Sequence, residues 1–318
     1  MRREHSSDVL ASIDVGSHTA RLLIARWEAG RLKSLLRKRA YIRLAQDFES
    51  SESGALKQAG IGRALKSLGE FRSDIEEYQA KRTRAVATGV VRAAANRDFF
   101  IDLVREKTGI QVEVLSGEQE ARLTGLGIQC ALDLGGRPFI AFDLGGGTTE
   151  FLLARQQGNS RALSLPLGAM ILTQRHFASD PPEEKEIESL KKETKGLLLK
   201  AFPDKISGTL LVGTGGTVTT LAAMAHGIDV QGVRPERMNG LFLCVQQLEE
   251  LLDRMTPLSV AERASLPGLD RGRADVILAG SVVVTEILNF FHSSEMMVSL
   301  TDLLEGALVD LLGVPWGH

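Results

Sequence analysis

The sequence predicts an α/β protein made of two related domains, each built around a central sheet. The segment 11–26, ASIDVGSHTARLLIAR, recurs in outline as the segment 140–155, IAFDLGGGTTEFLLAR. Each copy is an apolar strand ending in Asp-x-Gly, a turn of small residues and a second apolar strand, the pattern of a β-hairpin. Strand and helix patterns alternate elsewhere, as in α/β domains. We place the first domain at 1–125, completed by 305–318, and the second at 126–304.

Size and composition restrict the classes of partner. With 318 residues, the chain can form two domains that each bury a core. Hydrophobic residues make up 43% and charged residues 25%, the balance of a soluble globular protein. The net charge of −2 gives no general attraction to nucleic acid or to acidic lipid, so we expect neither as a partner. A polyanionic ligand would have to be held by a local basic cleft.

The chain carries no recognisable targeting or membrane segment. Residues 1–8 are charged and lack the apolar run of a signal peptide, and no later stretch is long and uncharged enough to span a bilayer. Cys130 and Cys244 lie far apart without CxxC spacing, so we predict reduced core thiols. The six histidines lack zinc-ligand spacing, so any metal site should use oxygen ligands. Together these features predict a cytoplasmic protein.

Local signals place the elements between the two hairpins. The segments 84–88 and 111–115 have the apolar pattern of short strands. Asn96 is expected to cap a helix that runs through Lys107. The segment 116–119, SGEQ, has the residues of a capping box and predicts the start of another helix.

Similar signals follow the second hairpin. The segment 180–183, DPPE, supplies a cap at Asp180, a proline and an acid in the order that opens a helix. The apolar segment 209–212 predicts a strand, which continues into the small residues GTGGT at 213–217. A helix is expected from about Val218.

The two Asp-x-Gly turns, DVGSH at 14–18 and DLGGGTTE at 143–150, have the composition of phosphate-binding loops. Small residues let the backbone close on a phosphate, and successive N–H groups form an anion-binding nest. The leading acids, Asp14 and Asp143, end strands where a divalent cation can bridge them to phosphate oxygens. One such motif could be a simple hairpin turn, but a matched pair favours phosphate. The turn at 213–217 adds a third anion contact before a helix.

These motifs together resemble the Ppx/GppA phosphatases, members of the superfamily of actin, heat-shock chaperones and acetate and sugar kinases. The resemblance covers nearly the whole chain and rests on IDVGS at 13–17, ATGVVRAAAN at 87–96, VLSGEQEARL at 114–123, FDLGGGTTE at 142–150, LPLGA at 165–169 and GTGGT at 213–217. The Ser-Gly-x-x-Glu-Ala-Arg-Leu part separates this family from actin-like kinases. The chain looks like the short form of the family. The resemblance implies two actin-like, ribonuclease H-like domains with an active-site cleft between them.

The resemblance also assigns roles to individual residues. Glu120 matches the family's catalytic glutamate, which would orient the attacking water and accept its proton, although Glu118 suits that role equally well on sequence grounds. Arg92 matches an arginine that would hold phosphate oxygens. The implied ligands of Mg²⁺ or Mn²⁺ are Asp143, Glu150 and Asp14. The implied phosphate contacts are Asp14, Gly16, Ser17, His18, Gly145, Gly146, Gly147, Thr148, Gly215 and Gly216.

The implied activity is hydrolysis of the terminal phosphoanhydride bond of inorganic polyphosphate or of guanosine pentaphosphate (pppGpp), by in-line attack of water. Polyphosphate and guanosine penta- or tetraphosphate are thus the expected partners. The oligomeric state is left open, with a homodimer as one alternative. An ATP-dependent kinase of the same superfamily is an alternative function, against which the Ser-Gly-x-x-Glu-Ala-Arg segment argues.

A second alternative, a catalytically weak sensor of (p)ppGpp or polyphosphate, is left open by departures from the family pattern. His18 stands where the family usually has asparagine. The family's Ser-Asp-x-Gly-x-Arg-Glu-Gly reads SLTDLLEG at 299–306, with Leu304 at the arginine position. Both changes would weaken the grip on phosphate.

Overall fold

The computed structural model describes residues 8–28, 31–46, 48, 54–154, 160–204, 206 and 208–313. The chain divides into two compact units, unit 1 with residues 1–130 and 302–318, and unit 2 with residues 131–301. The sequence placed the divisions after residues 125 and 304. Residues 314–318, the end of the segment expected to complete the first domain, lie outside the described residues.

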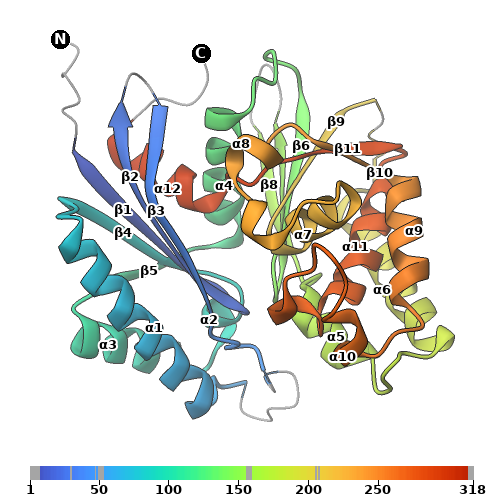
Figure 1. Ribbon diagram of the computed structural model, residues 1–318, viewed down its shortest axis with the longest axis horizontal. Helices are drawn as coiled ribbons and strands as arrows, with labels where there is room; N and C mark the ends of the chain where they lie inside the picture. Colours follow the sequence, from blue (N-terminus) through green and yellow to red (C-terminus); the bar gives the residue numbers. More distant parts are fainter. Residues whose placement is uncertain are drawn as a thin grey trace. The chain divides into compact units, whose positions relative to one another are not determined.

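Unit 1 is built on a five-stranded sheet with the strand order β3-β2-β1-β4-β5 (Figure 1). Its strands are β1 (Val9–Val15), β2 (Thr19–Glu28), β3 (Arg31–Tyr41), β4 (Arg82–Ala87) and β5 (Val112–Val114). The predicted hairpin is confirmed, because β1 and β2 pair in antiparallel fashion. β1 also pairs with β4 in parallel, which makes it the central strand and buries both of its faces.

Helices cover both faces of this sheet. They are α1 (Gln58–Glu77), α2 (Val90–Ala93), α3 (Arg97–Thr108), α4 (Gly117–Ala131) and α12 (Leu303–Leu312). α1 and α3 pack together on one side, and α12 contacts β1, β2 and β4 on the other (Figure 1). α12 crosses α4 so closely that a Cβ on Gly127 would overlap the Asp302 carbonyl, and one on Gly306 would overlap the Leu123 carbonyl. These glycines fix α12 against α4.

The helix starts in unit 1 partly follow the sequence signals. α4 begins with the predicted capping box, in which Ser116 N donates to Gln119 Oε1 at 2.8 Å and Gln119 N donates to Ser116 Oγ at 3.2 Å. Asn96 precedes α3 as predicted, but the expected side-chain cap is wrong. Its Oδ1 accepts from Leu56 N at 2.8 Å and its Nδ2 donates to Leu56 O at 3.1 Å. The amide satisfies a backbone segment distant in sequence instead of its own helix.

Unit 2 contains a six-stranded sheet with the order β10-β11-β9-β6-β7-β8. Its strands are β6 (Phe139–Leu144), β7 (Thr149–Ala154), β8 (Arg161–Leu165), β9 (Leu210–Thr214), β10 (Phe242–Cys244) and β11 (Glu295–Val298). β6 and β7 form the second predicted hairpin, and β6 pairs with β9 in parallel. The repeat in the sequence is therefore a repeat of structure.

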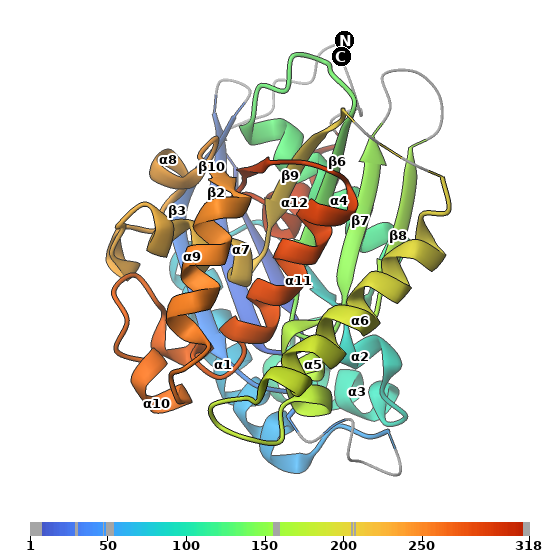
Figure 2. The ribbon, with the colours of Figure 1, turned by 90° about the vertical axis from the view of Figure 1, so that its right-hand side faces the viewer.

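The helices of unit 2 centre on the apolar α11, which packs against α5, α6, α7 and α9 (Figure 2). They are α5 (Ala169–His176), α6 (Glu184–Ala201), α7 (Gly216–Ala225), α8 (Pro235–Met238), α9 (Val245–Met255), α10 (Val260–Arg263) and α11 (Ile277–Phe290), with the 3₁₀ turns η1 (Val230–Gly232) and η2 (Arg271–Arg273). None of the helices in the described residues is long and apolar enough to cross a membrane.

The predicted start of α6 is corrected by the structure. The helix begins at Glu184 with Glu183 as its cap, rather than being capped by Asp180. The Asp180 carboxylate instead accepts from Val260 N at 2.9 Å and from Arg263 Nη2 at 3.2 Å. Asp180 therefore binds α10, although the local sequence pattern predicted that it would cap α6.

α7 begins at Gly216, two residues before the approximate start expected at Val218, and Gly215 is its cap with a φ of 92° that suits glycine. The prediction for the two cysteines is corrected. Cys130 and Cys244 are free thiols as predicted, but neither is a core residue: Cys130 is exposed and Cys244 is half-buried. Cys130 lies in the last turn of α4, beyond Ile128, the last buried residue of the helix.

Glu186 provides the capping box of α6. Its carboxylate accepts from Ser179 Oγ at 2.6 Å, from Ala178 N at 2.8 Å and from Glu183 N at 2.8 Å. These bonds, the Ser179 hydroxyl first, lower the pKa of Glu186 to about 2. Since this pKa lies below that of an unfolded glutamate, the carboxylate stabilises unit 2 above the unfolded pKa. That stability is lost as the pH falls through the folded pKa.

We therefore expect Glu186→Gln to lower the Tm near neutral pH and to have a smaller effect as the pH falls toward about 2. Thermal unfolding followed by circular dichroism at several pH values measures this. Glu188→Gln, on the same helix and paired with the exposed Lys191 side chain three residues on, is the control and should change the Tm little. An equal loss of Tm at neutral and acid pH would contradict the assignment.

Candidate active site

The loop between β6 and β7 leaves three consecutive N–H groups unused. Gly145 N donates to Thr148 O at 3.0 Å and closes the turn, while the Gly145 carbonyl accepts from Ala169 N, in the first turn of α5, at 2.9 Å. Within the described residues, the N–H groups of Gly146, Gly147 and Thr148 donate no hydrogen bond. Adjacent unpaired N–H groups in a glycine turn form an anion-binding nest.

Backbone contacts hold this loop in place. A Cβ on Gly168 would overlap the backbone of Gly147, so the segment before α5 lies directly against the loop. The Thr149 hydroxyl donates to Leu167 O at 2.8 Å and joins the same two segments. Contacts within the protein thus hold the loop in the shape of a nest, which reduces the entropy lost on binding an anion.

Two carboxylates lie beside the nest. Asp143 and Glu150 are opposite each other in the β6–β7 pair, and both are buried. Glu150 Oε1 accepts from Ser164 Oγ at 2.6 Å, and a Cβ on Gly215 would lie 2.5 Å from Asp143 Oδ1. Acids directly opposite each other on a sheet repel, and a cation between them relieves that repulsion.

The turn before α7 brings an arginine that the sequence did not single out. Gly215 caps α7 and Gly216 begins its first turn, where helix N–H groups lack partners within the helix and attract anions. The Arg273 guanidinium lies directly on Gly216, since a Cβ at that glycine would overlap it. Arg273 is buried, which its position in Arg-Gly-Arg did not reveal.

Unit 1 carries the predicted base. Arg92, in α2, donates from Nη1 to Glu120 Oε2 at 2.8 Å and to Leu115 O at 3.1 Å. Glu120, near the start of α4, is only 6% exposed. Glu118, two residues earlier, is exposed. The structure thus distinguishes two acids that the sequence left equivalent.

Asp14 is the second-last residue of β1, next to the first glycine turn. Arg21, its partner on β2, donates from Nε and Nη2 to Asp14 Oδ2 at 2.9 and 2.7 Å. Burial raises the pKa of Asp14, while the Arg21 charge and its hydrogen bonds oppose that rise. The turn itself is closed by Gly16 N, which donates to Thr19 O at 3.0 Å.

Two predicted phosphate contacts of this turn have protein neighbours. Ser17 is buried, and its hydroxyl accepts from Val90 N at 2.9 Å. His18 is buried edge-on against Tyr41, with ring centroids 5.3 Å apart. These contacts fix the shape of the turn, and a role of either side chain toward phosphate stays a prediction.

The donor set of unit 2 fits a magnesium ion that shares its coordination with substrate. No group of three or more His, Cys, Asp or Glu side chains in the described residues is arranged as a closed metal site. Mg²⁺ usually takes one or two protein carboxylates and completes its shell with waters and substrate phosphates. Asp143 and Glu150 supply such a pair beside the nest. Asp14 belongs to unit 1 and is a separate candidate.

Comparison with known proteins places this geometry in a family. A model of the Ppx/GppA phosphatase family matches residues 23–314. Exopolyphosphatase 2 of Mycobacterium tuberculosis is 31% identical, over 96% of this chain and 98% of that protein. The bifunctional 3-dehydroquinate synthase/phosphatase of Fusobacterium nucleatum is 30% identical over 94% of this chain, which spans only 46% of its length.

A solved structure of a member of the same family has a similar fold. The crystal structure of the Aquifex aeolicus member of the Ppx/GppA family is 31% identical and matches with a TM-score of 0.81, over 98% of this chain and 99% of that one. The predicted α/β fold with two actin-like, ribonuclease H-like domains is confirmed. The family match, the relatives and the fold agree, and the chain belongs to the Ppx/GppA phosphatase family.

Proposed function

We propose that this protein hydrolyses the terminal phosphoanhydride bond of inorganic polyphosphate or of pppGpp. The observation that carries the proposal is the buried Glu120 beside Arg92, in a chain that belongs to a phosphatase family. The Mycobacterium tuberculosis relative named an exopolyphosphatase supports polyphosphate as the substrate class. Phosphoryl transfer to water needs positioning and charge stabilisation more than a protein nucleophile.

Glu120 is the proposed base. Its Oε2 accepts from Arg92, which orients the carboxylate, and in the proposal this carboxylate accepts a proton from the attacking water. In the same proposal Arg92 keeps the base in place and offers its charge to a phosphate oxygen. Glu118, by contrast, is exposed.

The phosphates are held by backbone as much as by side chains. Gly146, Gly147 and Thr148 offer three N–H groups, and the turn at Gly215 and Gly216 offers a helix start. Backbone N–H donors bind the charged oxygens of any phosphate chain and make no contact that requires a particular base or sugar. This matches a substrate class defined by its phosphoanhydrides.

Asp143 and Glu150 are the proposed ligands of Mg²⁺ or Mn²⁺, with Asp14 as a further candidate from unit 1. Bound there, the cation would neutralise charge on the phosphates. A cation bound between them would also reduce the repulsion of two acids that are buried and directly opposite each other. Ser164 holds Glu150 in its orientation through the 2.6 Å hydrogen bond.

The substrate is tested by phosphate release from short polyphosphate, long polyphosphate, pppGpp and ATP in parallel. A net charge of −2 provides little long-range attraction for a polyanion, so only local groups hold it. We expect a higher kcat/KM on short polyphosphate or pppGpp than on long chains. We also expect affinity to fall as ionic strength rises and the screening length drops to about 8 Å or less.

The same panel separates the rival functions. Processive, salt-independent degradation of long chains would contradict the expected preference. Phosphate transfer from ATP to an acceptor without release would indicate a kinase. Tight binding of (p)ppGpp without turnover would indicate a sensor, a reading favoured by Leu304, which lies in an apolar cluster where the family pattern has an arginine.

A further inference from the structure

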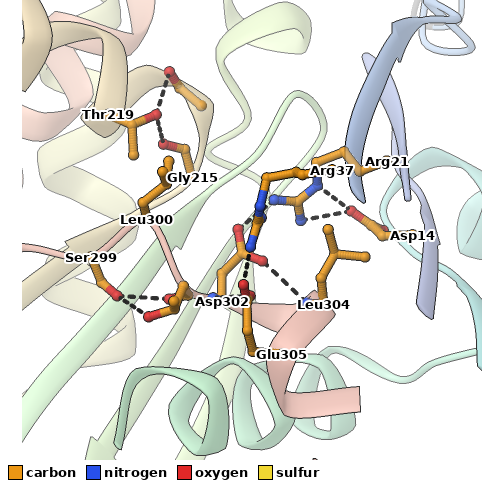
Figure 3. A network of polar contacts seen from close by, with 12 residues as sticks. Asp14, Arg21, Arg37, Gly215, Thr219, Ser299, Leu300, Asp302, Leu304 and Glu305 are labelled. Atoms are coloured by element: carbon orange, nitrogen blue, oxygen red, sulfur yellow. Dashed lines mark hydrogen bonds and ion pairs between the residues drawn. The ribbon is translucent and has the colours of Figure 1, made fainter. Parts of the chain in front are cut away.

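A buried ion-pair network joins the start of α12 to Asp14. Asp302 caps α12 and is 2% exposed. Its Oδ1 accepts from Leu304 N at 3.1 Å, and its Oδ2 accepts a charge-assisted hydrogen bond from Arg21 Nη1. Figure 3 shows Arg21 between Asp14 and Asp302, with Arg37 directed at Glu305. One guanidinium therefore serves two carboxylates.

All three nitrogens of the Arg21 guanidinium donate to one of two carboxylates. Nε and Nη2 converge on a single oxygen of Asp14, while Nη1 is held by Asp302. Without the Asp302 carboxylate, Nη1 would lose this partner, and the guanidinium would be held less firmly against Asp14. Arg side chains lose much rotamer entropy on being fixed, so a second anchor makes the first more persistent.

The backbone of α12 does not adjust freely. The helix is set against α4 by the crossing at Gly127 and Gly306, and Ser12 Oγ donates to Leu304 O at 2.8 Å. The Asp302 carboxylate thus projects from a fixed point toward Arg21. In the family pattern this position is glycine, which has no side chain to make the contact.

We propose that Asp302 is a positioning residue, which holds Arg21 so that two of its donors stay on Asp14 Oδ2 and keep that carboxylate oriented in the first glycine turn. The proposal rests on the proposed function, in which Asp14 contributes to phosphate or metal binding. Asp302 itself touches neither, and acts through Arg21.

The alternative is that Asp302 merely caps a helix, and Glu305 provides a matched control for it. Glu305 lies in the same helix turn and is also buried, accepts from Asp302 N at 3.1 Å through Oε2, and pairs with Arg37 through Oε1. Glu305→Gln removes a buried charge and its arginine pair while glutamine still completes the capping box. No hydrogen bond links Arg37 to Asp14 in the described residues.

Asp302→Asn removes one carboxylate oxygen of two that are both in use. Asparagine caps helices as well as aspartate does, so its single oxygen can keep Leu304 N while its amide faces Arg21 donor to donor. Arg21→Lys makes the same break from the other side without changing α12, because an ammonium lacks the fork that spans both acids. The two variants therefore guard against a misfolded α12.

The experiment measures Tm, kcat, KM and Mn²⁺ affinity for wild type, Asp302→Asn, Arg21→Lys and Glu305→Gln. Mn²⁺ binding is followed by electron paramagnetic resonance on the protein without substrate. We expect Asp302→Asn and Arg21→Lys to lower kcat about tenfold or more and to weaken Mn²⁺ binding severalfold. Glu305→Gln should lower the Tm as much as Asp302→Asn does, yet leave kcat and Mn²⁺ affinity near the wild-type values.

The possible outcomes distinguish a failure of the proposed function from a failure of the positioning role of Asp302. Wild-type protein that releases no phosphate from any substrate overturns the proposed function, while the Mn²⁺ titration still tests the positioning role. Active wild type with Asp302→Asn and Glu305→Gln indistinguishable in kcat and Mn²⁺ affinity overturns the positioning role alone. A loss of activity in Asp302→Asn that Arg21→Lys does not share also overturns it.

Discussion

Glu120→Gln should lower kcat by about 10²–10⁴-fold, the usual contribution of a general base, while KM changes little. Glutamine keeps the shape of the side chain and an oxygen that can accept from Arg92, but it cannot accept a proton from water. The lost charge on the Arg92 pair should cost about 1–3 kcal/mol of stability. Steady-state phosphate release and thermal unfolding measure the two effects.

Glu118→Gln is the matched control for this result. It makes the same chemical change two residues away on the same helix, at an exposed position. We expect turnover and Tm close to those of the wild type. If Glu118→Gln abolished turnover and Glu120→Gln did not, the placement of the base would be wrong.

Removing divalent cations with EDTA should abolish hydrolysis, and Mg²⁺ or Mn²⁺ should restore it. Asp143→Asn and Glu150→Gln should each raise the Mg²⁺ concentration for half-maximal activity about tenfold or more, because each removes one hard oxygen charge from the pair. Titration of activity against Mg²⁺ measures the shift. It tests the proposal that these acids, and not a distant group, bind the cation.

Two controls define this second result. Ser164→Ala removes the hydroxyl that orients Glu150 and should shift the Mg²⁺ requirement in the same direction by a smaller factor. Glu188→Gln removes an exposed acid of unit 2 and should leave the requirement unchanged. Full hydrolysis in EDTA would rule out the metal assignment.

Local sequence signals predicted the parts of the fold that depend on neighbours in the chain. Both hairpins follow from alternating apolar residues around a small turn, and each has the predicted pairing. The capping box at Ser116 was also predictable, because its two hydrogen bonds join residues three positions apart. Glu120 was placed near a helix start for the same reason, although only the fold separates it from Glu118.

Features that depend on distant residues could not be predicted in this way. Asn96 and Asp180 are good caps in sequence, but each is used by a segment far along the chain. Arg273 looks like any surface arginine until Gly216 is placed beside it. Arg21 and Asp302 are 281 positions apart, so no local sequence pattern predicts that they pair.

The core of unit 1 has a consequence for how the protein is made. Its apolar cluster joins Leu10 and Leu23 from the first strands to Leu304 and Leu308 from α12. Unit 2 is one continuous stretch, residues 131–301, and leaves the ribosome before α12 does. Unit 1 therefore begins to be translated first but receives its last helix, α12, only after all of unit 2 has been made. This differs from the usual order, in which the N-terminal domain folds first. Until α12 emerges, Leu10 and Leu23 lack the apolar side chains of α12 that bury them in the finished unit.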